Sequence, residues 1–382
     1  MNPISCVRNR AAPWTLLALS VVLTPACRQT DDAGPALPFS AARQVGDTLY
    51  LSGQAASDAS GPGAATQKVM AGLKAELVAN GFTLDDVVAS QVWLADLQNY
   101  KQMNDVYGAH FSKHFPSRTT VGAERLPGNA DVEIAMVASK AEKKFVAGNH
   151  NLPFSTGVIA GDTVYLSGQV GIDPSTGKLV NGDIVAHTTQ TMKNIENHLK
   201  SMSMSFADAV SVWVYLTDPD TFDDFSTTYK QFITGAAPVR IPVGVNALPL
   251  NSPIEITIIA SRGHREPVWQ LDAKPSPTAI YSPGLKADNR VYLAGTGSKK
   301  PTMEECVDQC MQHLDKVLQG DGLTFDDVVE ARVYLSNLDD YAAMNTAYRK
   351  YFENTFPTRA TIGVKRLVRD FRIYVGLVAA AR

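Results

Sequence analysis

The chain of 382 residues has no strong excess of either charge. It carries 35 basic and 38 acidic side chains, a formal net charge of −3, and no dense run of lysine or arginine. A dedicated nucleic-acid-binding protein usually presents a basic patch or stripe, so this balance argues against that class. With 45% apolar and 19% charged residues, the composition is that of an ordinary globular protein.

A long hydrophobic run is also missing. The apolar segment 14–23 is too short to span a bilayer comfortably. Two arginines precede it, and Ala26 and Cys27 follow it before a polar stretch, which is the pattern of an export signal. We therefore predict that 1–27 is an export signal or lipoprotein leader, with Cys27 as a candidate lipidation site. The expected location is the periplasm or the membrane surface; a cytoplasmic location is the alternative if the leader does not function.

Cysteine is scarce, with four residues, of which two belong to the leader. The other two, Cys306 and Cys310, are one helical turn apart, and His313 lies one turn further on. Such spacing can bring three metal ligands together. Core packing is the preferred interpretation, because the helix continues with apolar residues and free cysteine behaves as a small hydrophobic side chain. A disulfide within one helix would be strained. We predict no metal site.

Three similar segments follow the leader. Each begins with a strand that ends in a tight turn, at 50–54, 165–169 and 292–296. Each later has an arginine that opens a strand, namely Arg118, Arg240 and Arg359. Fifteen residues after each arginine stand Glu133, Glu255 and Tyr374. Internal repetition of this kind restricts both the fold and the position of any site.

The repeat is supported by identity as well as by motifs. Segment 83–122 aligns with 324–363 without a gap, and 18 of the 40 positions are identical. The period of roughly 110–120 residues exceeds the length of a solenoid unit, so each copy is long enough to be a domain with its own core. The predicted domains are 36–143, 148–264 and 276–382.

Hydrophobic periodicity in the third copy predicts the order β-α-β-α-β-β. The expected elements are strands at 290–294, 328–335, 360–364 and 373–379, helices at 303–318 and 339–352, and a helix start at 324–327. Two helices can cover only one face of a sheet. We expect the other copies to cover the second face, which predicts a pseudo-threefold monomer with clefts between copies. Segments 140–148 and 262–277 are interpreted as linkers.

These marks resemble a known family. They are Ser-Gly-Gln after the first strand, a Met-Asn-x-x-Tyr-x-x-x-Phe helix at 103–111 and 344–352, a Pro-x-Arg strand and Glu-Ile fifteen residues later. Together they are similar to the Rid family, the reactive intermediate deaminases also known as YjgF or L-PSP proteins. The resemblance covers 38–140, 152–263 and 278–382, and its strength lies in the order and spacing of the motifs in triplicate.

The resemblance implies an α+β fold like that of chorismate mutase, in three tandem copies that form a pseudo-trimer, with sites at the interfaces between copies. It implies hydrolysis of reactive enamines and imines, such as 2-aminoacrylate, to 2-oxo acids and ammonia without a metal or organic cofactor. The residues that match the family's substrate-binding positions are Arg118, Arg240, Arg359, Gly53, Gly168, Gly295 and Tyr281. The matching catalytic residues are Glu133 and Glu255.

The residue types suit that chemistry. A planar guanidinium grips a planar carboxylate through two parallel hydrogen bonds, which lysine cannot do. A carboxylate such as Glu133 can then orient water or move protons. The alternatives are structural: an arginine paired at an interface, a glutamate facing solvent on an alternating strand, or Ser-Gly-Gln as a turn only. Asn104 and Asn345 are more simply explained as structural residues.

The copies depart from the family pattern in different places. Phe39 and Phe154 stand where the family has tyrosine, and the second copy has Ser226 and Pro242. The third copy has Tyr374 in place of glutamate. Tyr281 and the glutamates are therefore never in one copy, and a composite interface would be needed to unite them. We expect three inequivalent sites.

Three functions are weighed. The first is an imine or enamine deaminase; the second is a binding protein for small carboxylates outside the cytoplasm; the third is ribonuclease or chaperone-like activity, which the charge balance disfavours. Unrelated hydrolysis on the same scaffold completes the set. The predicted partners are an imino, enamino or 2-oxo acid, and no nucleic acid.

Overall fold

A computed structural model describes residues 37–148, 151–233, 236–271 and 279–380. The chain divides into two units, Met1–Leu37 and Pro38–Arg382, and all the helices and strands named below belong to the second. The predicted leader and Cys27 lie outside the described residues. Within the described ranges, no helix is both long and apolar enough to cross a membrane.

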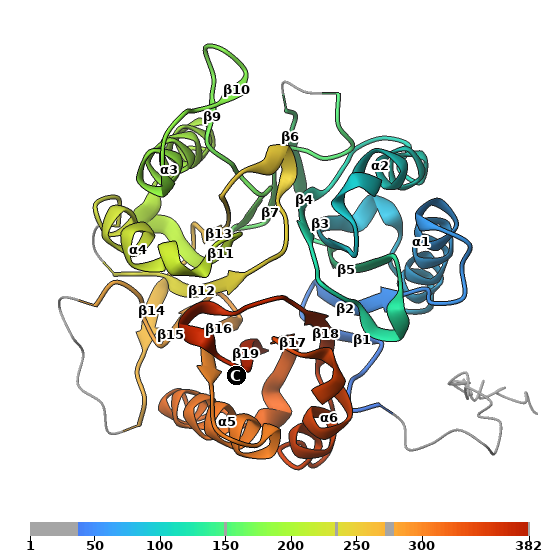
Figure 1. Ribbon diagram of the computed structural model, residues 1–382, viewed down its shortest axis with the longest axis vertical. Coiled ribbons are helices and arrows are strands. Elements are labelled where there is room, and N and C mark those ends of the chain that lie inside the picture. The colour runs from blue at the N-terminus through green and yellow to red at the C-terminus, as the bar shows by residue number, and fades with distance from the viewer. Residues whose placement is uncertain (1–36, 149–150, 234–235, 272–278, 381–382) are drawn as a thin grey trace, which may run out of the picture. The chain divides into compact units, whose positions relative to one another are not determined.

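Each repeat forms one large sheet with two helices (Figure 1), and the second repeat adds a separate two-stranded sheet of β9 and β10. The first repeat contains β1 (Ala42–Val45), β2 (Thr48–Ala55), α1 (Pro62–Ala79), β3 (Val87–Leu94), α2 (Tyr100–Ala109), β4 (Ser117–Gly122) and β5 (Val132–Ser139). The second contains β6 (Lys143–Val146), β7 (Gly157–Ala160), β8 (Thr163–Leu166), β9 (Ile172–Asp173), β10 (Lys178–Leu179), α3 (Ile184–Ser201), β11 (Ala209–Leu216), α4 (Phe222–Lys230), β12 (Val239–Gly244) and β13 (Ile254–Ser261). The third contains β14 (Arg265–Val268), β15 (Gly284–Ala287), β16 (Arg290–Ser298), α5 (Met303–Gly320), β17 (Val328–Leu335), α6 (Tyr341–Arg349), β18 (Thr358–Gly363) and β19 (Ile373–Ala380).

The three sheets share one topology. Their strand orders are β1-β2-β5-β3-β4, β6-β7-β8-β13-β11-β12 and β14-β15-β16-β19-β17-β18. In each, the strand that carries the arginine lies parallel to the strand between the helices, which pairs antiparallel with the strand that carries the glutamate position. The α+β fold in three tandem copies is confirmed.

Two details of the predicted order were wrong. An additional strand (β1, β7 or β15) precedes the expected first strand of each copy and pairs with it as a hairpin. The helix start expected at 324–327 is a single 3-10 turn, Phe325–Asp327, which leads directly into β17. The Asp327 side chain accepts from the Thr324 backbone N–H, so the turn has a closed cap and needs no longer helix.

The segments interpreted as linkers are not simple tethers. Residues of 140–148 form β6, which pairs with β7, and residues of 262–277 form β14, which pairs with β15. Each linker thus adds an edge strand to the sheet of the repeat that follows it. The prediction missed these strands because each has only four residues and β14 contains Pro267.

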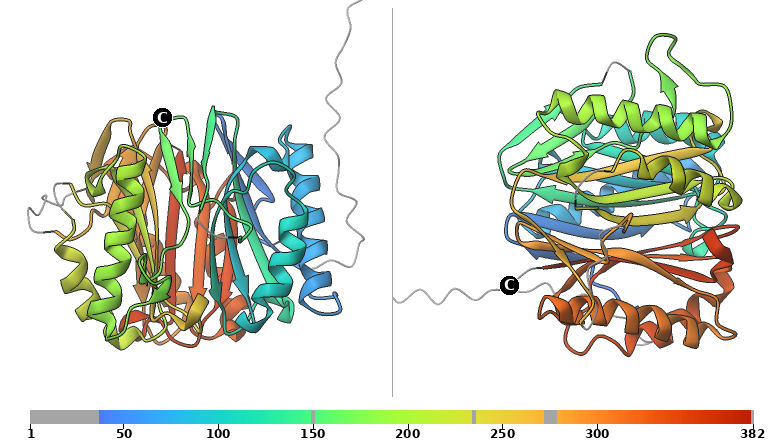
Figure 2. Two further views of the ribbon diagram at one scale, coloured as in Figure 1. Left: turned by 90° about the horizontal axis from the view of Figure 1, so that it is seen from above. Right: turned by 90° about the vertical axis from the view of Figure 1, so that its left-hand side faces the viewer.

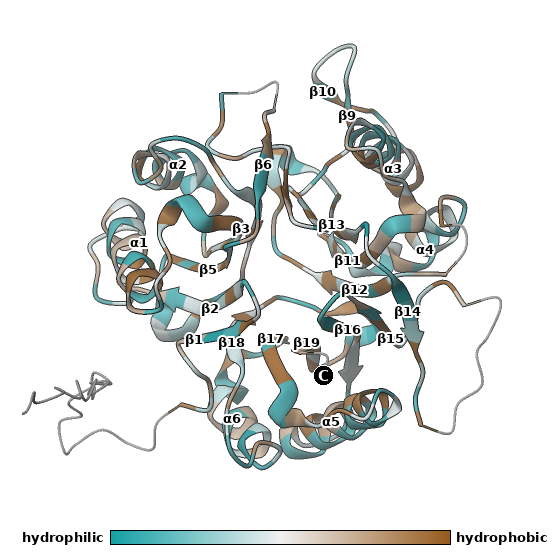
Figure 3. Ribbon diagram, turned by 180° about the vertical axis from the view of Figure 1, so that it is seen from behind, coloured by the Kyte–Doolittle hydropathy of each residue, from teal (hydrophilic) through white to brown (hydrophobic). Residues whose placement is uncertain are grey.

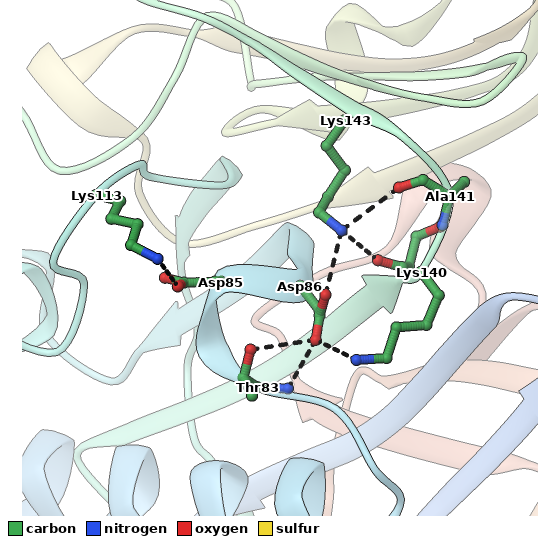
Figure 4. A network of polar contacts seen from close by, with 8 residues as sticks. Thr83, Asp85, Asp86, Lys113, Lys140, Ala141 and Lys143 are labelled. Carbon is green, nitrogen blue, oxygen red and sulfur yellow. Dashed lines mark hydrogen bonds and ion pairs between the residues drawn. The ribbon is translucent and has the colours of Figure 1, made fainter.

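The first linker is also held to the repeat that precedes it. Asp86 accepts from the ammonium groups of Lys140 and Lys143, at 2.7 and 3.2 Å, and from the Thr83 backbone N–H, while Asp85 pairs with Lys113 (Figure 4). The network connects the turn before β3 with Lys140, which follows β5, and with Lys143, which begins β6. It therefore fixes where the chain leaves the first repeat.

Helix α5 illustrates how the helices cover one sheet face. Its buried side chains recur with helical spacing, and Cys306 and Cys310 are fully buried among them. Burial raises the pKa of the Cys310 thiol to about 12, so it stays protonated. His313 lies on the exposed side and contacts Gln270. The core-packing interpretation of the two cysteines is confirmed, and His313 does not join them.

The opposite sheet faces pack against other repeats. One apolar cluster draws members from all three copies, including Tyr50, Val158 and Val329. Figure 2 shows strands of different repeats side by side, with the helices outside them. The second sheet face is therefore covered by the rest of the chain, as expected. Pseudo-threefold symmetry of the whole stays a prediction.

A small cavity of about 50 Å³ lies between the sheets and is lined by Tyr50, Tyr165 and Tyr292, the same position of each repeat. Arg290 is buried beside them and donates to the Tyr165 hydroxyl at 2.9 Å and to Thr163 Oγ1 at 2.7 Å. The lining also includes Glu330 and Arg332 of β17, a strand that carries both hydrophobic and hydrophilic residues (Figure 3). The interior between repeats is thus partly polar.

Candidate active-site clefts between repeats

Equivalent contacts join the repeats at three seams. A serine near the start of one repeat donates its backbone N–H to the carbonyl of the proline that precedes the arginine strand of another. These bonds are Ser155 to Pro116 at 3.0 Å, Ser282 to Pro238 at 3.1 Å and Ser40 to Pro357 at 2.9 Å. Each seam brings the arginine of one repeat to the glycine segment and glutamate position of the next repeat in a cycle. The tight turn predicted at these glycines is wrong for the first and third repeats, because β2 and β16 continue through Gly53 and Gly295 with a shift of register. We name the three clefts by their arginines.

The Arg118 cleft lies between the first and second repeats. Arg118 is 3% exposed, and its backbone N–H donates to Ser167 Oγ at 2.8 Å. Its guanidinium lies 5.0 Å from the ring centres of Tyr107 and Phe154 and 5.6 Å from that of Tyr100. Nη2 donates to the Tyr100 hydroxyl at 3.2 Å, whereas buried Nη1 has no hydrogen-bond partner among the described residues. One side of the guanidinium is left for a ligand.

A groove of about 710 Å³ borders this cleft and shares Phe154 and Asn104 with its surroundings. Its lining also contains Lys101, Lys113 and His114. Lys101 pairs with Asp105 of the same lining at 2.7 Å, and Lys113 pairs with Asp85 at 2.9 Å. The groove therefore opens beside Phe154, and both of its lysines are paired with carboxylates.

The Arg359 cleft lies between the third and first repeats and has the same construction. The Arg359 backbone N–H donates to Ser52 Oγ at 2.8 Å, and Nη2 donates to Asn345 Oδ1 at 2.6 Å. Rings of Phe39, Tyr341 and Tyr348 lie 5.1–5.8 Å from the guanidinium. Nη1 is again buried with no partner in the described part of the chain. Asn345 thus orients the arginine.

A glutamate stands in each of these two clefts. Glu255 lies with Arg118, and Glu133 lies with Arg359, each 3% exposed. Burial raises the pKa of both carboxyls to about 8, although the arginine charge and one backbone N–H, from Thr120 or Thr361, favour the ionised form. Oε2 of each has no hydrogen-bond partner within the described ranges. At neutral pH each cleft therefore holds a protonated carboxyl that can donate to a ligand.

The Arg240 cleft, between the second and third repeats, differs. Arg240 donates from Nη1 to Ser226 Oγ at 3.2 Å, and its guanidinium lies 5.3–5.6 Å from four aromatic rings. One of these rings belongs to Tyr281. The position of the glutamate is taken by Tyr374, whose hydroxyl donates to the Gly295 carbonyl at 3.0 Å. This cleft has an arginine but no carboxyl at the glutamate position.

The idea that an interface unites Tyr281 with a glutamate is therefore wrong. Each cleft takes its tyrosine or phenylalanine, its glycine and its glutamate position from one repeat, and its arginine strand and second helix from another. Tyr281 consequently meets Arg240 and Tyr374. A departure in one repeat therefore lies in the same cleft as departures of the neighbouring repeat.

The predicted glycine role also needs correction at one site. The Gly168 N–H donates to the Arg118 carbonyl at 3.0 Å and is not available to a ligand. The three glycines share a steric role instead. A Cβ atom on Gly53 or Gly168 would lie 2.0 or 1.7 Å from a glutamate Oε1, and one on Gly295 would lie 2.2 Å from a ring carbon of Tyr374. Glycine leaves room for the side chain at the glutamate position.

Two groups of site residues were not predicted from the sequence. The aromatic rings around each arginine come mainly from the second helix of its own repeat, whose Met-Asn-x-x-Tyr motif was a visible signal. The backbone donors of Thr120 and Thr361 had no signal, because any residue except proline offers an N–H.

Comparison with known proteins gives a family match to all three repeats and relatives that match about one repeat each. A family model described as "Endoribonuclease L-PSP" matches residues 30–140, 148–262 and 271–381. A mouse protein named "2-iminobutanoate/2-iminopropanoate deaminase" is 40% identical over 111 residues, which are 29% of this chain and 82% of the mouse protein. A RutC family protein of Sulfurisphaera tokodaii is 38% identical over 111 residues, 29% of this chain and 89% of its own.

Two solved structures are similar to parts of this chain. RidA from a Psychrobacter species is 33% identical and covers 31% of this chain and 94% of its own, with a TM-score of 0.29. A chorismatase is 11% identical and covers 78% of this chain and 93% of its own, with a TM-score of 0.53. The second similarity extends beyond a single repeat and concerns the fold alone.

Proposed function

We propose that this chain, which belongs to the endoribonuclease L-PSP family, hydrolyses small 2-imino acids to 2-oxo acids and ammonia at its Arg118 and Arg359 clefts. One observation carries the proposal. Each of these clefts places a buried guanidinium with an unpaired Nη1 beside a buried carboxyl whose pKa is raised to about 8. The name of the mouse relative, 2-iminobutanoate/2-iminopropanoate deaminase, supports the choice of substrate class.

The guanidinium binds the carboxylate of the substrate. A 2-imino acid presents a planar carboxylate, which can accept from the free edge of Arg118 or Arg359. Charge-assisted hydrogen bonds contribute roughly 1.5–3 kcal/mol each. The aromatic rings around the guanidinium exclude water from it and strengthen the interaction. The substrate is thereby held with its imine group in the cleft.

The carboxyl supplies the protons. Neutral Glu255 or Glu133 gives its proton to the imine nitrogen, and the resulting carboxylate accepts a proton from the water whose oxygen bonds to the imine carbon. In the carbinolamine so formed, the carboxyl protonates the amino nitrogen and takes back the hydroxyl proton. The C–N bond breaks, ammonia leaves and the 2-oxo acid remains. Acid–base help of this kind contributes about 10²–10⁴-fold.

The test is release of ammonia and 2-oxo acid by the full chain, with imino acids generated in situ by an amino-acid oxidase. We expect Arg118→Met and Arg359→Met each to remove part of the acceleration and the double variant to remove nearly all of it. Arg125→Met is the matched control, because Arg125 is an exposed arginine that pairs with Asp339 outside the clefts.

A folded double variant that keeps the wild-type rate would contradict the assignment of these clefts. So would a wild-type chain that fails to accelerate hydrolysis of any small imino acid at high enzyme concentration.

A further inference from the structure

The Arg240 cleft keeps the means to hold a carboxylate. Arg240 is 5% exposed and lies at the same place in β12 as its counterparts do in β4 and β18. The rings around its guanidinium are those of Phe222, Phe225, Tyr229 and Tyr281. Tyr281 is partly exposed, at 42%, so the cleft has a polar ring at a solvent-accessible position. A buried guanidinium can hold a small carboxylate through two parallel hydrogen bonds.

The same cleft has lost the carboxyl. Tyr374 pairs with Tyr334 across two strands, in the register that pairs Glu133 with Trp93 and Glu255 with Tyr215. The Tyr374 hydroxyl is committed to the Gly295 carbonyl, and burial raises its pKa above the ordinary value. A neutral phenol that already donates to the backbone cannot exchange protons with a substrate and water at neutral pH.

A second change lies opposite the first and comes from another repeat. In the two clefts with glutamate, the residue two positions after the arginine, Thr120 or Thr361, donates its backbone N–H to the carboxyl. The corresponding residue of the Arg240 cleft is Pro242, which has no N–H. The proton carrier and the donor that anchors it are therefore both absent from this cleft, while the arginine and its aromatic walls remain.

We propose that the Arg240 cleft is a binding-only site for a small 2-oxo acid, the product of the other two clefts, and that Tyr374 and Pro242 together separate binding from hydrolysis. The inference rests on the proposed function, because the ligand is the product of that reaction. A 2-oxo acid matches the donors present: its carboxylate suits Arg240, and its oxo group can accept from a hydroxyl such as that of Tyr281 or Ser226.

The first experiment isolates this cleft in the full chain. In the Arg118→Met/Arg359→Met variant, pyruvate is titrated by calorimetry, and we expect one site per chain. Adding Arg240→Met should weaken pyruvate binding by at least about tenfold. Arg240→Lys, which keeps the buried positive charge, should also weaken pyruvate binding. Arg125→Met is again the surface control. Absence of pyruvate binding to the folded double variant would overturn the proposal.

The second experiment restores hydrolysis. In the same double variant we expect no imine hydrolysis. Adding Tyr374→Glu alone should give little hydrolysis, and adding Pro242→Thr alone should give none. Adding Tyr374→Glu/Pro242→Thr together should give clear turnover. Turnover by the Arg240 cleft before Tyr374 is replaced would overturn the binding-only assignment. A Tyr374→Glu/Pro242→Thr chain that binds pyruvate but stays inert would overturn the role given to this pair of residues.

The two proposals fail in different ways. A wild-type chain that is inert toward imines but binds pyruvate through Arg240 would end the deaminase proposal and leave this cleft as a receptor. An active wild type whose Arg240 cleft binds nothing would end the present inference alone.

Discussion

At the scale of single residues, the protonation state of two carboxyls decides the chemistry. Glu133 and Glu255 each lie beside an arginine, which by itself would favour an ionised carboxylate. Burial outweighs the arginine and raises each pKa to about 8. The clefts therefore offer an acid at neutral pH, and an acid is what an imine nitrogen needs.

This predicts the direction of the pH dependence. Because the reaction begins with the protonated carboxyl, kcat/KM should fall as pH rises through about 8, the pKa of Glu133 and Glu255. The measurement is a pH–rate profile with one imino acid between pH 6 and 10.

The Glu133→Gln/Glu255→Gln variant separates this effect from ionisation of the substrate. Glutamine keeps the shape but cannot give up a proton, so the rate should drop by about 10²–10⁴-fold and lose its fall near pH 8. A wild-type rate that rises through pH 8 would show that the ionised carboxylate is the active form.

The same shift links pH to stability. An unfolded glutamate titrates near 4.5, whereas the folded carboxyls hold their protons up to about 8. The stability that these two groups contribute is thus fully present below the lower value and is lost as pH rises through the upper one. We expect the thermal midpoint of the wild type to fall more steeply between pH 5 and 8 than that of the Glu133→Gln/Glu255→Gln variant.

The sequence revealed the arginines, the glutamates and Tyr281 through their positions in a repeated pattern. It could not reveal which arginine meets which glutamate, because that depends on the order in which the repeats pack. Pro242 was visible as a departure from the pattern. Its meaning required the packing of the repeats, which brings the strand of Arg240 to Tyr374, a residue of another repeat.

At the scale of elements, the segment that follows β8 contains a glycine because of the side chain that lies against it. Gly168 follows β8, and a Cβ atom there would lie 1.7 Å from Glu255 Oε1. Overpacking of this kind usually costs about 1–3 kcal/mol and moves side chains. The glycine is therefore required by the carboxyl beside it.

Gly168→Ala should consequently disable one cleft and spare another. In an Arg359→Met background, where only the Arg118 cleft remains active, we expect imine hydrolysis to be largely lost. In an Arg118→Met background the same change should have little effect. Equal loss in both backgrounds would indicate general unfolding, which a thermal melt would detect.

The linker strands are elements that local sequence patterns do not indicate. Strand β14 reads Arg-Glu-Pro-Val and has little β-propensity, yet it pairs with β15 over its whole length. The neighbouring repeat supplies the sheet edge on which it forms. The longer strands and helices were predictable because their own periodicity identifies them.

Hydrogen exchange distinguishes a paired strand from a tether. We expect peptides that contain β14 to exchange on the order of 10² times more slowly than the exposed turn at 175–177. Measurement is by mass spectrometry on the folded full chain. Exchange as fast as in that turn would show that 265–268 does not remain paired in solution.

At the scale of the whole molecule, the three repeats have become chemically different where they meet. Arg290 lies at a position occupied by threonine in the other two repeats, Thr48 and Thr163. It donates to Thr163 and Tyr165 of the second repeat, and its charge is close to the hydroxyl of Tyr50 in the first. One cation thus serves three repeats.

Arg290→Thr should therefore destabilise the chain although it restores the residue found in the other copies. The substitution removes the buried guanidinium that donates to the Tyr165 hydroxyl. This loss should lower the free energy of unfolding by about 1–3 kcal/mol. Urea unfolding is the measurement, with Arg125→Met expected to cost about 0–1 kcal/mol as an exposed pair. An unchanged midpoint for Arg290→Thr would contradict this role.

The single buried Arg290 also bears on how the three duplicated segments of the gene evolve. Duplicated segments of a gene tend to be kept alike when one copy overwrites another. Here, copying the third repeat over the first or second would bring a second arginine to a place that holds one, and two buried like charges repel strongly. Arg290 therefore opposes the overwriting of the first or second repeat by the third, the event that would also replace Glu133 or Glu255 with the tyrosine found at Tyr374.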